Sequence, residues 1–579
     1  MMVSAKTPRR DEGAALVIVI AVGAVVALFM TLLVTVSVNG TKQASSDANW
    51  NAALAAAYAG VDEYQSRLSA DTSYWRYGNN ASAFSSASVV SPPPAPNPAF
   101  GVGPGGSWAS IVDSEDRAQF RYEVDNSHYA SAGRIRVRST GKVGEATRTV
   151  VADLKQEGFI DFLYFTDYEV QDPSIVGTNK LECFQPGTKT LKYSWESRPL
   201  TGCNDLAFLE SDDINGPLHS NDTIRACGTD FNGPVTSANK ATPFSRMNSS
   251  GSAVGCKVSN FALSGFPAYS GGVIGMPPTN AQLMKETRTD LTVDVPRPGC
   301  LYTGPTQFTF DKHGNVNIKS PFTQKTRIAN EAATAGSDPP ECGAIAQLQS
   351  VAGATIKVPD NNVMYVQNVP ALAGNANAWA PGTLPKDFKC ETTSKREGWS
   401  FGSGGYPVSN EASPSVTTYD CRGGDVFVKG QFNGAATIAA ENYVYIVGDI
   451  TYVDQQDDIL GIVGNNAVWV WNPVRSNGTA INADNRTIHA AILSVAHTFQ
   501  VQNADKGGSQ GVLTVRGAIA QKYRGIVYSN GNGYTKNYVY DDRFKVQAPP
   551  KFLNPVTTTY GVTTWIEIGA VWAADGSAR

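Results

Sequence analysis

Residues 13 to 38, GAALVIVIAVGAVVALFMTLLVTVSV, form one apolar run near the start of the chain. Three basic residues, Lys6, Arg9 and Arg10, precede the run, and the next charged side chain after it is Lys42. As a helix the run would extend roughly 39 Å, which exceeds the ~30 Å hydrocarbon core of a bilayer. The run therefore predicts a single membrane-spanning helix. Because positive charge stays on the cytoplasmic side, we expect the N-terminus in the cytoplasm and the remaining chain outside the cell membrane.

The helical pattern continues beyond the membrane run. Apolar positions recur at helical spacing from Trp50 through Leu54 and Val61 to Leu68, which is typical of an amphipathic helix. We expect one long helix over residues 14–68, with residues 14–38 in lipid and the other half outside.

The start of the run decides what kind of membrane segment it is. A charged leader, residues 1–13, ends at Gly13, and the apolar run begins at once with Ala14. The run is longer than the core of a cleaved secretory signal, and no small-x-small cleavage site follows it by Thr41. Two interpretations remain: a plain membrane anchor, and a leader that is removed before the helix leaves the membrane.

A leader that ends in glycine, an uninterrupted apolar half-helix and an Ala-rich amphipathic half-helix resemble a type IV prepilin. The GAALVIVI opening and residues 55–61, AAAYAGV, are similar to those of the PilX-like minor pilins. The resemblance covers the leader and the helix only. It implies cleavage after Gly13 by a prepilin peptidase, methylation of the new Ala14 amine, and transfer of the helix into a filament core by the pilus assembly machinery. It also implies other pilins, major and minor, as partners.

One position departs from the family pattern. Most major pilins carry a glutamate at the fifth mature position, which in the family is thought to neutralise the N-terminal amine of the subunit ahead. Counting from Ala14, that position is Ile18. A buried ammonium without a partner is costly, but the first subunit of a filament has no subunit ahead of it. Ile18 is thus compatible with a place at the tip; an ordinary anchor or another cleavage position would also account for it.

Composition agrees with an exported, β-rich protein. The chain has 579 residues, of which 42% are hydrophobic and only 17% charged, with 55 glycines and 32 prolines. The formal net charge of -4 gives no reason to predict a nucleic-acid partner. The eight cysteines all follow the apolar run, so we expect up to four disulfides with open connectivity, the alternative being buried free thiols. These disulfide candidates are Cys183, Cys203, Cys227, Cys256, Cys300, Cys342, Cys390 and Cys421.

A small sheet is expected directly after the helix. Residues 81–106 are rich in proline and glycine and predict a loop. Residues 107–157 then predict a pilin-like antiparallel β-meander that covers the outer half of the helix. Its predicted strands are 118–124, 134–138 and 146–154, with a hairpin at 141–144 between the last two.

The remaining residues, 158–579, predict a large β-rich domain with internal repeats. Ten-residue segments that start at Ile438, Ile462 and Ile492 align without gaps, and a segment from Leu513 resembles another copy. Short strands at such spacing favour a β-solenoid, with a cysteine-rich insertion at about 240–422; a β-sandwich is the alternative. The expected fold class is α+β, mostly β.

A turn signature also repeats in this domain, at 214–217 (INGP), 231–234 (FNGP) and 432–435 (FNGA).

The sequence does not predict an enzyme. Glycan-cleaving β-helix proteins need clustered carboxylates beside a cation, but the candidates lie at corners where Asp is an ordinary turn former. An acidic corner also lacks the full pattern of a calcium loop. We therefore predict no catalytic residue, no cofactor and no metal site. The clusters weighed are Asp212, Asp213, Asp222 and Asp230 with His219 and Arg225, and Asp454, Asp457 and Asp458.

Four aromatic residues are the remaining candidates for ligand contact. Trp469 and Trp471 share one strand face, beside Tyr443 and Tyr445 of the preceding repeat. On an outer face they would suit contact with a sugar or a protein, whereas in a solenoid interior they would stack with one another.

Two functions fit the sequence. In the first, the chain is a minor pilin at or near the tip of a type IV filament, priming assembly and presenting a surface for adhesion or partner binding. It would reside in the cell membrane before assembly and in the extracellular filament afterwards. A domain as large as residues 158–579 would crowd its neighbours in a filament shaft, which favours the tip. In the second, the chain is a bitopic cell-surface adhesin or a glycan-active β-helix protein that is not part of a filament.

Overall fold

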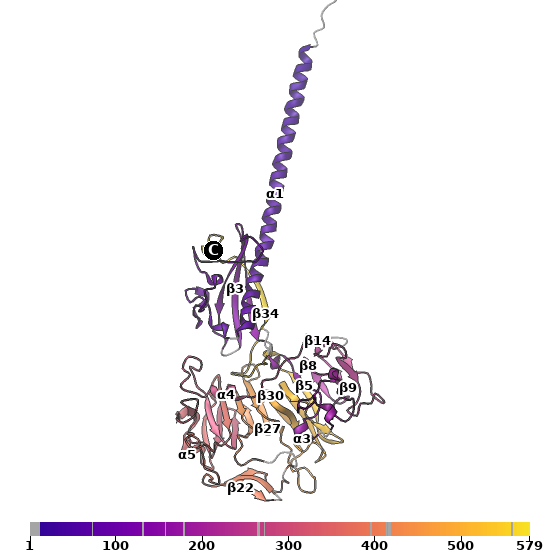
Figure 1. The fold of residues 1–579 in the computed structure, drawn as a ribbon, viewed down its shortest axis with the longest axis vertical. Coiled ribbons are helices and arrows are strands. Elements are labelled where there is room, and N and C mark those ends of the chain that lie inside the picture. The colour runs from indigo at the N-terminus through magenta and orange to yellow at the C-terminus, as the bar shows by residue number, and fades with distance from the viewer. Residues whose placement is uncertain are drawn as a thin grey trace, which may run out of the picture. The chain divides into compact units, whose positions relative to one another are not determined.

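The computed structural model describes residues 12–71, 73–129, 133–156, 158–177, 180–262, 267–270, 272–393, 396–412, 414, 419–556 and 560–579. A long N-terminal helix is followed by a large domain that is mostly β, so the predicted fold class is confirmed (Figure 1). Tertiary contacts divide the chain into two compact units. Unit 1 comprises the described residues up to Ser127 with Ile135–Leu154 and Val562–Arg579, and unit 2 comprises His128–Arg134 and Lys155–Gly561.

Unit 1 packs the second half of the long helix α1 against a sheet. The strand order is β1–β2–β3–β4–β34, and β1 and β3 pair antiparallel with β2. The three strands expected after the helix lie within β2, β3 and β4, and the Pro/Gly-rich loop contains two short 3-10 turns, η2 and η3. The bounds are α1 Glu12–Ala70, η1 Tyr74–Arg76, η2 Ala83–Ser85, η3 Pro98–Phe100, β1 Ala109–Ser110, β2 Ala118–Asp125, β3 Arg134–Val143, β4 Ala146–Gln156 and β34 Tyr560–Ile568.

The last strand of the chain completes the sheet of unit 1. β34 lies beside β4, so the two strands that flank unit 2 in the sequence are neighbours in the sheet. Residues 158–579 were expected to form one domain, whereas the contacts place Val562–Arg579 with the helix. Unit 2 is therefore an insertion between two adjacent strands, and no local pattern in the sequence marks the return of the chain.

Contacts with β2 hold the C-terminal segment in unit 1. The guanidinium of Arg121 lies 4.4 Å from the ring centre of Trp108 and 4.2 Å from that of Trp572. It donates to the carbonyls of Gly103 and Gly576, both at 3.1 Å, and burial lowers the pKa of Arg121 to about 10. The indole of Trp572 donates to Glu123 at 3.1 Å. A cation between two aromatic faces thus joins the second strand to the end of the chain.

Unit 2 is built on a parallel stack of strands. Each strand pairs in parallel with the next, in the spatial order β15, β21, β26, β28, β30, β31, β5, β8, β11, β14. This is not the order of the chain, because β5 to β14 come first in the sequence but follow β31 in space. The bounds are β5 Tyr164–Tyr168, β8 Leu218–Ser220, β11 Val235–Ser237, β14 Ala268–Tyr269, β15 Cys300–Thr303, β21 Asn362–Gln367, β26 Ala435–Ala440, β28 Ile459–Gly464, β30 Arg486–Val501 and β31 Ser509–Tyr523.

The chain enters this parallel stack in its middle. From β5 it proceeds to one end at β14, resumes at the other end with β15, and returns to β31, beside β5. The connection from β14 to β15 runs along the stack, where the buried Asn280 donates to the carbonyl of Ala440 at 2.7 Å and accepts from the hydroxyl of Tyr365 at 3.1 Å. Such polar anchors satisfy the buried polar groups of a long connection.

Two further runs of parallel pairs accompany the stack. One is β16–β25–β27–β29–β30 and the other is β31–β33–β7–β10–β13. The bounds in these runs are β7 Asp213–Asn215, β10 Asp230–Phe231, β13 Asn260–Phe261, β16 Thr306–Asp311, β25 Val426–Phe432, β27 Val444–Tyr452, β29 Val468–Val470 and β33 Asn532–Tyr540.

The other described elements of unit 2 lie outside these parallel runs. They are α3 Pro173–Val176, α4 Ala281–Lys285, α5 Ile345–Leu348, η4 Phe159–Asp161, η5 Leu181–Cys183, η6 Ser194–Glu196, η7 Pro340–Cys342, η8 Asp542–Lys545, β6 Phe208–Leu209, β9 Ile224–Cys227, β12 Phe244–Arg246, β17 Asn315–Lys319, β18 Arg327–Ile328, β19 Gly336–Ser337, β20 Ala354–Lys357, β22 Phe388–Thr393, β23 Arg396–Phe401, β24 Gly404–Tyr406 and β32 Tyr528–Ser529.

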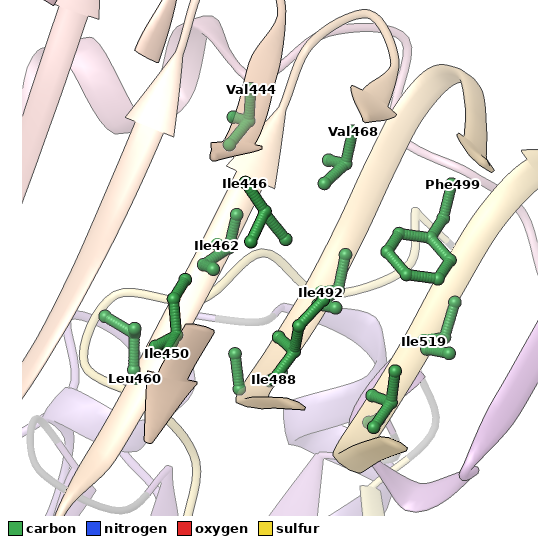
Figure 2. Close-up of a cluster of buried hydrophobic side chains, with 14 of the residues drawn as sticks. Val444, Ile446, Ile450, Leu460, Ile462, Val468, Ile488, Ile492, Phe499 and Ile519 are labelled. Atoms are coloured by element: carbon green, nitrogen blue, oxygen red, sulfur yellow. The ribbon is translucent and has the colours of Figure 1, made fainter. Parts of the chain in front are cut away.

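The internal repeats occupy equivalent positions in the stack. Ile438 pairs with Ile462, and Ile462 pairs with Ile492, as the gap-free alignment predicts. The segment from Leu513 lies in β31, which pairs with β30 as a further copy should, and the residue equivalent to Ile492 is Ile519. The side chains at these positions fill the interior of unit 2 in successive layers, together with those of Val444, Ile446, Val468 and Phe499 (Figure 2).

The repeated turn signature also has a physical reason. Ile214 pairs with Phe231, which places the first two copies of the signature on top of each other. A Cβ atom added at Gly233 would lie 2.2 Å from the backbone of Gly216, so the corners stack backbone on backbone and require glycine. Asn232 donates to the side-chain oxygen of Asn215 at 2.8 Å. The third copy, at 432–435, forms the corner between β25 and β26.

The cysteine-rich segment at 240–422 is not a simple insertion. It contributes β14, β15 and β21 to the parallel stack, so it builds part of the core of unit 2. The antiparallel strands β22, β23 and β24 form a separate small sheet within it. All eight candidate cysteines are paired, each with the next in sequence: Cys183–Cys203, Cys227–Cys256, Cys300–Cys342 and Cys390–Cys421.

A ladder of amide side chains stabilises one corner of the parallel stack. Asn466 donates to Asn442 at 2.6 Å, and Asn442 donates to Oδ1 of Asp425 at 2.7 Å. Oδ1 of Asp425 also accepts from the backbone N–H of Tyr443 at 3.1 Å, while its Oδ2 is buried without a hydrogen-bond partner among the described residues. Burial raises the pKa of Asp425 to about 8, and the nearby Asp420 raises it further.

The substitution Asp425→Asn is expected to stabilise unit 2 at neutral pH. Between the unfolded pKa near 4 and the folded pKa of about 8, the folded state binds the proton more tightly. The stability of the wild type therefore falls as pH rises through this window, whereas asparagine contributes no such dependence. Urea denaturation should show similar stability of the two proteins at pH 4.5 and higher stability of the variant at pH 8. Replacement of the exposed Asp457 by Asn is the control, and parallel pH profiles for wild type and Asp425→Asn would contradict the prediction.

Candidate functional site

The first half of α1 presents its apolar side chains to the surroundings. The large apolar side chains from Leu16 to Val38 are between 46% and 68% exposed. By length and composition α1 could cross a membrane, and it is the one helix among the described residues of which this is true. An apolar surface of this extent is not stable in water. It therefore requires lipid or other protein segments around it.

Three threonine hydroxyls in and just after this half are satisfied within the helix. The hydroxyls of Thr31, Thr35 and Thr41 donate to backbone carbonyls one turn earlier, those of Leu28, Thr31 and Ser37, at 2.7–2.8 Å. Threonine hydroxyls commonly bond in this way inside helices. Because the hydroxyls of these three residues are already hydrogen-bonded, they do not make burial of the helix in lipid or in a dry helix bundle unfavourable.

The second half of α1 is held firmly on the sheet. Ala53, Ala57 and Val61 are fully buried against it. A Cβ atom added at Gly141 of β3 would lie 2.1 Å from the carbonyl oxygen of Ala53 and 2.3 Å from the backbone nitrogen of Ala57. Helix and strand therefore approach at backbone distance, which only glycine permits. Farther along the helix, Tyr64 packs edge-to-face with Tyr74, Phe100 and Tyr122.

The predicted processing and assembly residues lie at the free end of the helix. Gly13 and Ala14 belong to the first turn of α1, and Ile18 is 61% exposed. Residues 1–11 of the predicted leader lie outside the described residues. Cleavage after Gly13, methylation of Ala14 and the assembly role of Ile18 stay predictions.

The four candidate ligand-contact aromatics are mostly inside unit 2. Tyr445, Trp469 and Trp471 are no more than 8% exposed, and only Tyr443 is half-buried. Tyr445 and Trp469 pair in register, as the shared strand face predicts. Side chains of the 379–421 region cover them, since Tyr419 packs against Tyr445 and accepts from the indole of Trp471 at 3.1 Å. Tyr445, Trp469 and Trp471 therefore stack inside unit 2, as the internal interpretation expects, and ligand contact at Tyr443 stays a prediction.

Of the acidic residues around His219, Asp212 and Asp222 are buried in internal ion pairs, whereas Asp213 and Asp230 are exposed. Asp222 pairs with Arg198 at 2.6 Å, and Asp212 pairs with Lys536 at 2.8 Å. His219 is buried between the hydroxyl of Thr236 and the amide of Asn221, and burial lowers the pKa of His219 to about 4. These contacts engage Asp212, Asp222 and His219 in the interior of unit 2.

A serine, a histidine and an aspartate do meet at α3, in an arrangement unsuited to catalysis. Nδ1 of His497 lies 2.5 Å from Asp172 and 3.1 Å from the hydroxyl of Ser174, which itself donates to Asp172 at 2.6 Å. A nucleophilic serine needs the opposite ring nitrogen of the histidine. Asp172 instead caps the helix by accepting from the backbone N–H of Ser174 at 2.8 Å. Among the described residues no group of three or more His, Cys, Asp and Glu side chains is placed to hold a metal ion.

The buried ion pair between Arg524 and Glu169 was not predicted from the sequence. Nη1 of Arg524 donates to Glu169 at 2.8 Å, and both side chains are almost fully buried. The guanidinium also lies 3.6 Å from the ring centre of Phe208. The pair joins the end of β31 to the end of β5, where the last repeat of the chain meets the first. No sequence signal connects the two residues, because they are 355 positions apart.

Comparison with known proteins finds a distant likeness among solved structures. No family model and no curated protein matches the chain. Among solved structures, the crystal structure of the competence-associated pilin ComZ from Thermus thermophilus matches 90% of this chain and 97% of that chain. The sequence identity is 11% and the TM-score is 0.25. The likeness is too weak to support an inference, so function must be argued from the residues of this chain.

Proposed function

We propose that the chain is a type IV filament subunit, a PilX-like minor pilin that carries unit 2 at or near the filament tip. The observation that carries this proposal is the division of α1. One half is fixed to a sheet at backbone distance, and the other half is apolar on every side and free of contacts within the described residues. Such a helix suits two environments in succession, the membrane before assembly and a bundle of similar helices afterwards.

The tip position is supported by size and by Ile18. Unit 2 is inserted into the small sheet of unit 1, and a body of this size would crowd neighbouring subunits in a shaft. A subunit that follows another in the filament would need a carboxylate at position 18 to neutralise the N-terminal amine of the subunit ahead. This chain has Ile18 there, which suits a first subunit with no subunit ahead of it. There the domain would prime assembly and present a surface for adhesion or for other pilins. We also propose that unit 2 is a solenoid rather than a sandwich, because parallel pairing at the repeat spacing supports coils that cover one another.

The second candidate is a bitopic surface protein with no filament role, for which the same exposed apolar half would serve as a permanent anchor. The two candidates differ in processing. For a pilin, intact-mass analysis of protein from native membranes should find a mature chain that begins with a methylated Ala14. The variant Gly13→Leu should then accumulate as the full-length precursor.

Gly23→Leu is the matched control for this experiment. Gly23 lies in the same exposed apolar half, and nothing lies within 4 Å of a Cβ atom added there. This variant should be processed normally. A wild-type chain that retains residues 1–13 in native membranes would exclude the pilin proposal. For the tip position, antibody label should appear at filament ends, and label scattered along shafts would exclude it.

A further inference from the structure

A cavity of about 470 Å³ lies at the β15 end of the parallel stack in unit 2. One wall is the chain that leads into β15, residues 296–300, and a second is the connection from β20 to β21. The side chains of Arg327 and Glu341 complete the lining. The volume lies within the range of small-molecule sites in proteins, about 300–1,000 Å³.

Hydrogen bonds and a disulfide hold the walls of this cavity in place. Arg327 donates through Nε to the carbonyl of Gly299 at 3.1 Å and through Nη2 to the carbonyl of Pro298 at 2.7 Å. Asn362 donates to the carbonyl of Arg297 at 3.1 Å, which joins the first wall to the second. The disulfide between β15 and η7 fixes the segment that carries Glu341. A cavity fixed in this way loses little conformational entropy when a ligand binds.

Positive charge is in excess in the cavity. Three cationic side chains, Arg297, Arg327 and Lys357, line it with two carboxylates, Glu341 and Asp360, which leaves an excess of one positive charge. Arg327 pairs with Glu341 at 3.1 Å. Arg297 and Lys357 are exposed and donate to backbone carbonyls, at 2.9 Å and 2.8 Å. Among the described residues neither of these two cations pairs with a carboxylate.

This charge balance suits a ligand that carries one negative charge. A phosphate monoester carries about −1.5 to −2 at neutral pH, and its second charge would be repelled by Glu341 and Asp360. A carboxylate carries one charge and matches a guanidinium with two parallel hydrogen bonds. Within the described residues the guanidinium of Arg297 makes one hydrogen bond, so its other N–H groups can bind such a carboxylate.

The other groups of the cavity suit a sugar ring. The carboxylates of Glu341 and Asp360 accept hydrogen bonds, which ligand hydroxyls can donate. Three prolines in the walls present apolar C–H surface. Small-molecule sites commonly combine such apolar surface with a few polar groups that fix the orientation of the ligand. A ligand with one carboxylate, several hydroxyls and apolar C–H faces matches these walls.

We propose that this cavity binds a uronic acid, a sugar with a single carboxylate, within an extracellular glycan. The carboxylate pairs with the guanidinium of Arg297, and hydroxyls of the sugar ring donate to Glu341 and Asp360. The inference gives a ligand class to the adhesive surface of unit 2, and it rests on that part of the proposed function. It does not depend on whether the chain is carried by a filament or by a permanent anchor.

NMR titration of small probes with the purified full chain in a mild detergent tests the proposal. The methyl glycoside of glucuronic or galacturonic acid should bind at least tenfold more tightly than the matching methyl glucoside or galactoside, which lacks the carboxylate. Acetate, which has the carboxylate but no ring, should also bind at least tenfold more weakly than the uronide. Equal affinity for the uronide and its neutral counterpart, equal affinity for the uronide and acetate, or no binding of either uronide at millimolar concentrations would overturn the proposal.

Arg297→Met should weaken binding of the uronide at least tenfold, and Arg297→Lys, which keeps the charge, should weaken it less. Arg475→Met is the matched control. Arg475 is an exposed arginine of unit 2 that also donates to a backbone carbonyl, and it does not line the cavity. This control should leave the affinity unchanged, and equal losses in Arg297→Met and Arg475→Met would overturn the proposal. Hydrogen exchange of β15 and β21 shows whether each variant is folded.

The outcomes separate this inference from the proposed filament role. Failure of the uronide to bind the folded wild type overturns the inference alone. A wild-type chain that retains residues 1–13 in native membranes excludes the pilin proposal, and the binding measured with the purified chain is unaffected by that result.

Discussion

Replacing Arg524 with methionine is expected to lower the free energy of unfolding of unit 2 by about 3–5 kcal/mol, because it leaves a buried charge without its partner. Glu169 is fully buried, and its Oε2 accepts from Arg524. Its other oxygen accepts from the hydroxyl of Thr166, which cannot compensate a full negative charge. The loss should concentrate where β31 meets β5.

Urea denaturation of the full chain in a mild detergent, followed by hydrogen exchange, measures this effect. Peptides from β5 and β31 should lose protection first. The double variant Arg524→Met with Glu169→Gln should regain most of the stability, since a neutral amide in place of the carboxylate removes the unpaired charge. If the double variant is no more stable than Arg524→Met alone, the loss comes from packing against Phe208 rather than from the ion pair.

The variant Gly141→Val is expected to separate α1 from its sheet, at a cost of about 3 kcal/mol or more to unit 1. The new side chain would meet backbone atoms of Ala53 and Ala57, and a helix backbone cannot rotate away as a side chain can. Hydrogen exchange should show lost protection in β2, β3 and the second half of α1.

Gly569→Val is the matched control for this variant. Gly569 also belongs to unit 1, and nothing lies within 4 Å of a Cβ atom added there. It should leave the protection of unit 1 unchanged, and peptides of unit 2 should be unaffected by either variant. Equal effects of the two substitutions would mean that the close approach at Gly141 does not determine the stability of unit 1.

The sequence predicted the parts of the fold that depend on local periodicity. The expected helix over 14–68 is observed as Glu12–Ala70, and the spacing of Ile438, Ile462 and Ile492 placed three strands in correct register. Periodicity does not encode the order in which strands stack. The same alternation is consistent with β5 at an end of the stack or in its middle, so the entry of the chain beside β31 could not be predicted.

The sequence left the exposure of the candidate aromatic residues open, because distant segments decide it. The shared face of Tyr445 and Trp469 was correctly predicted, but the residues that cover this face lie in the 379–421 region. The partner of Glu169 lies 355 positions away, and the contact between Tyr58 and Trp565 depends on the return of the last strand. Such contacts follow from topology, which short sequence patterns do not contain.

The insertion of unit 2 between β4 and β34 also has a mechanical consequence. A terminal domain hangs from one peptide connection, whereas unit 2 is connected at both ends to neighbouring strands of one sheet. A force that pulls on unit 2 is therefore shared by β4 and β34. The contacts of Arg121 with Trp108 and Trp572 oppose the removal of β34 and the segment after it from the sheet. A single cut by a protease in either connection would leave unit 2 covalently attached. If unit 2 has the proposed place at a filament tip, its second connection would keep it attached under a pulling force after the first is cut.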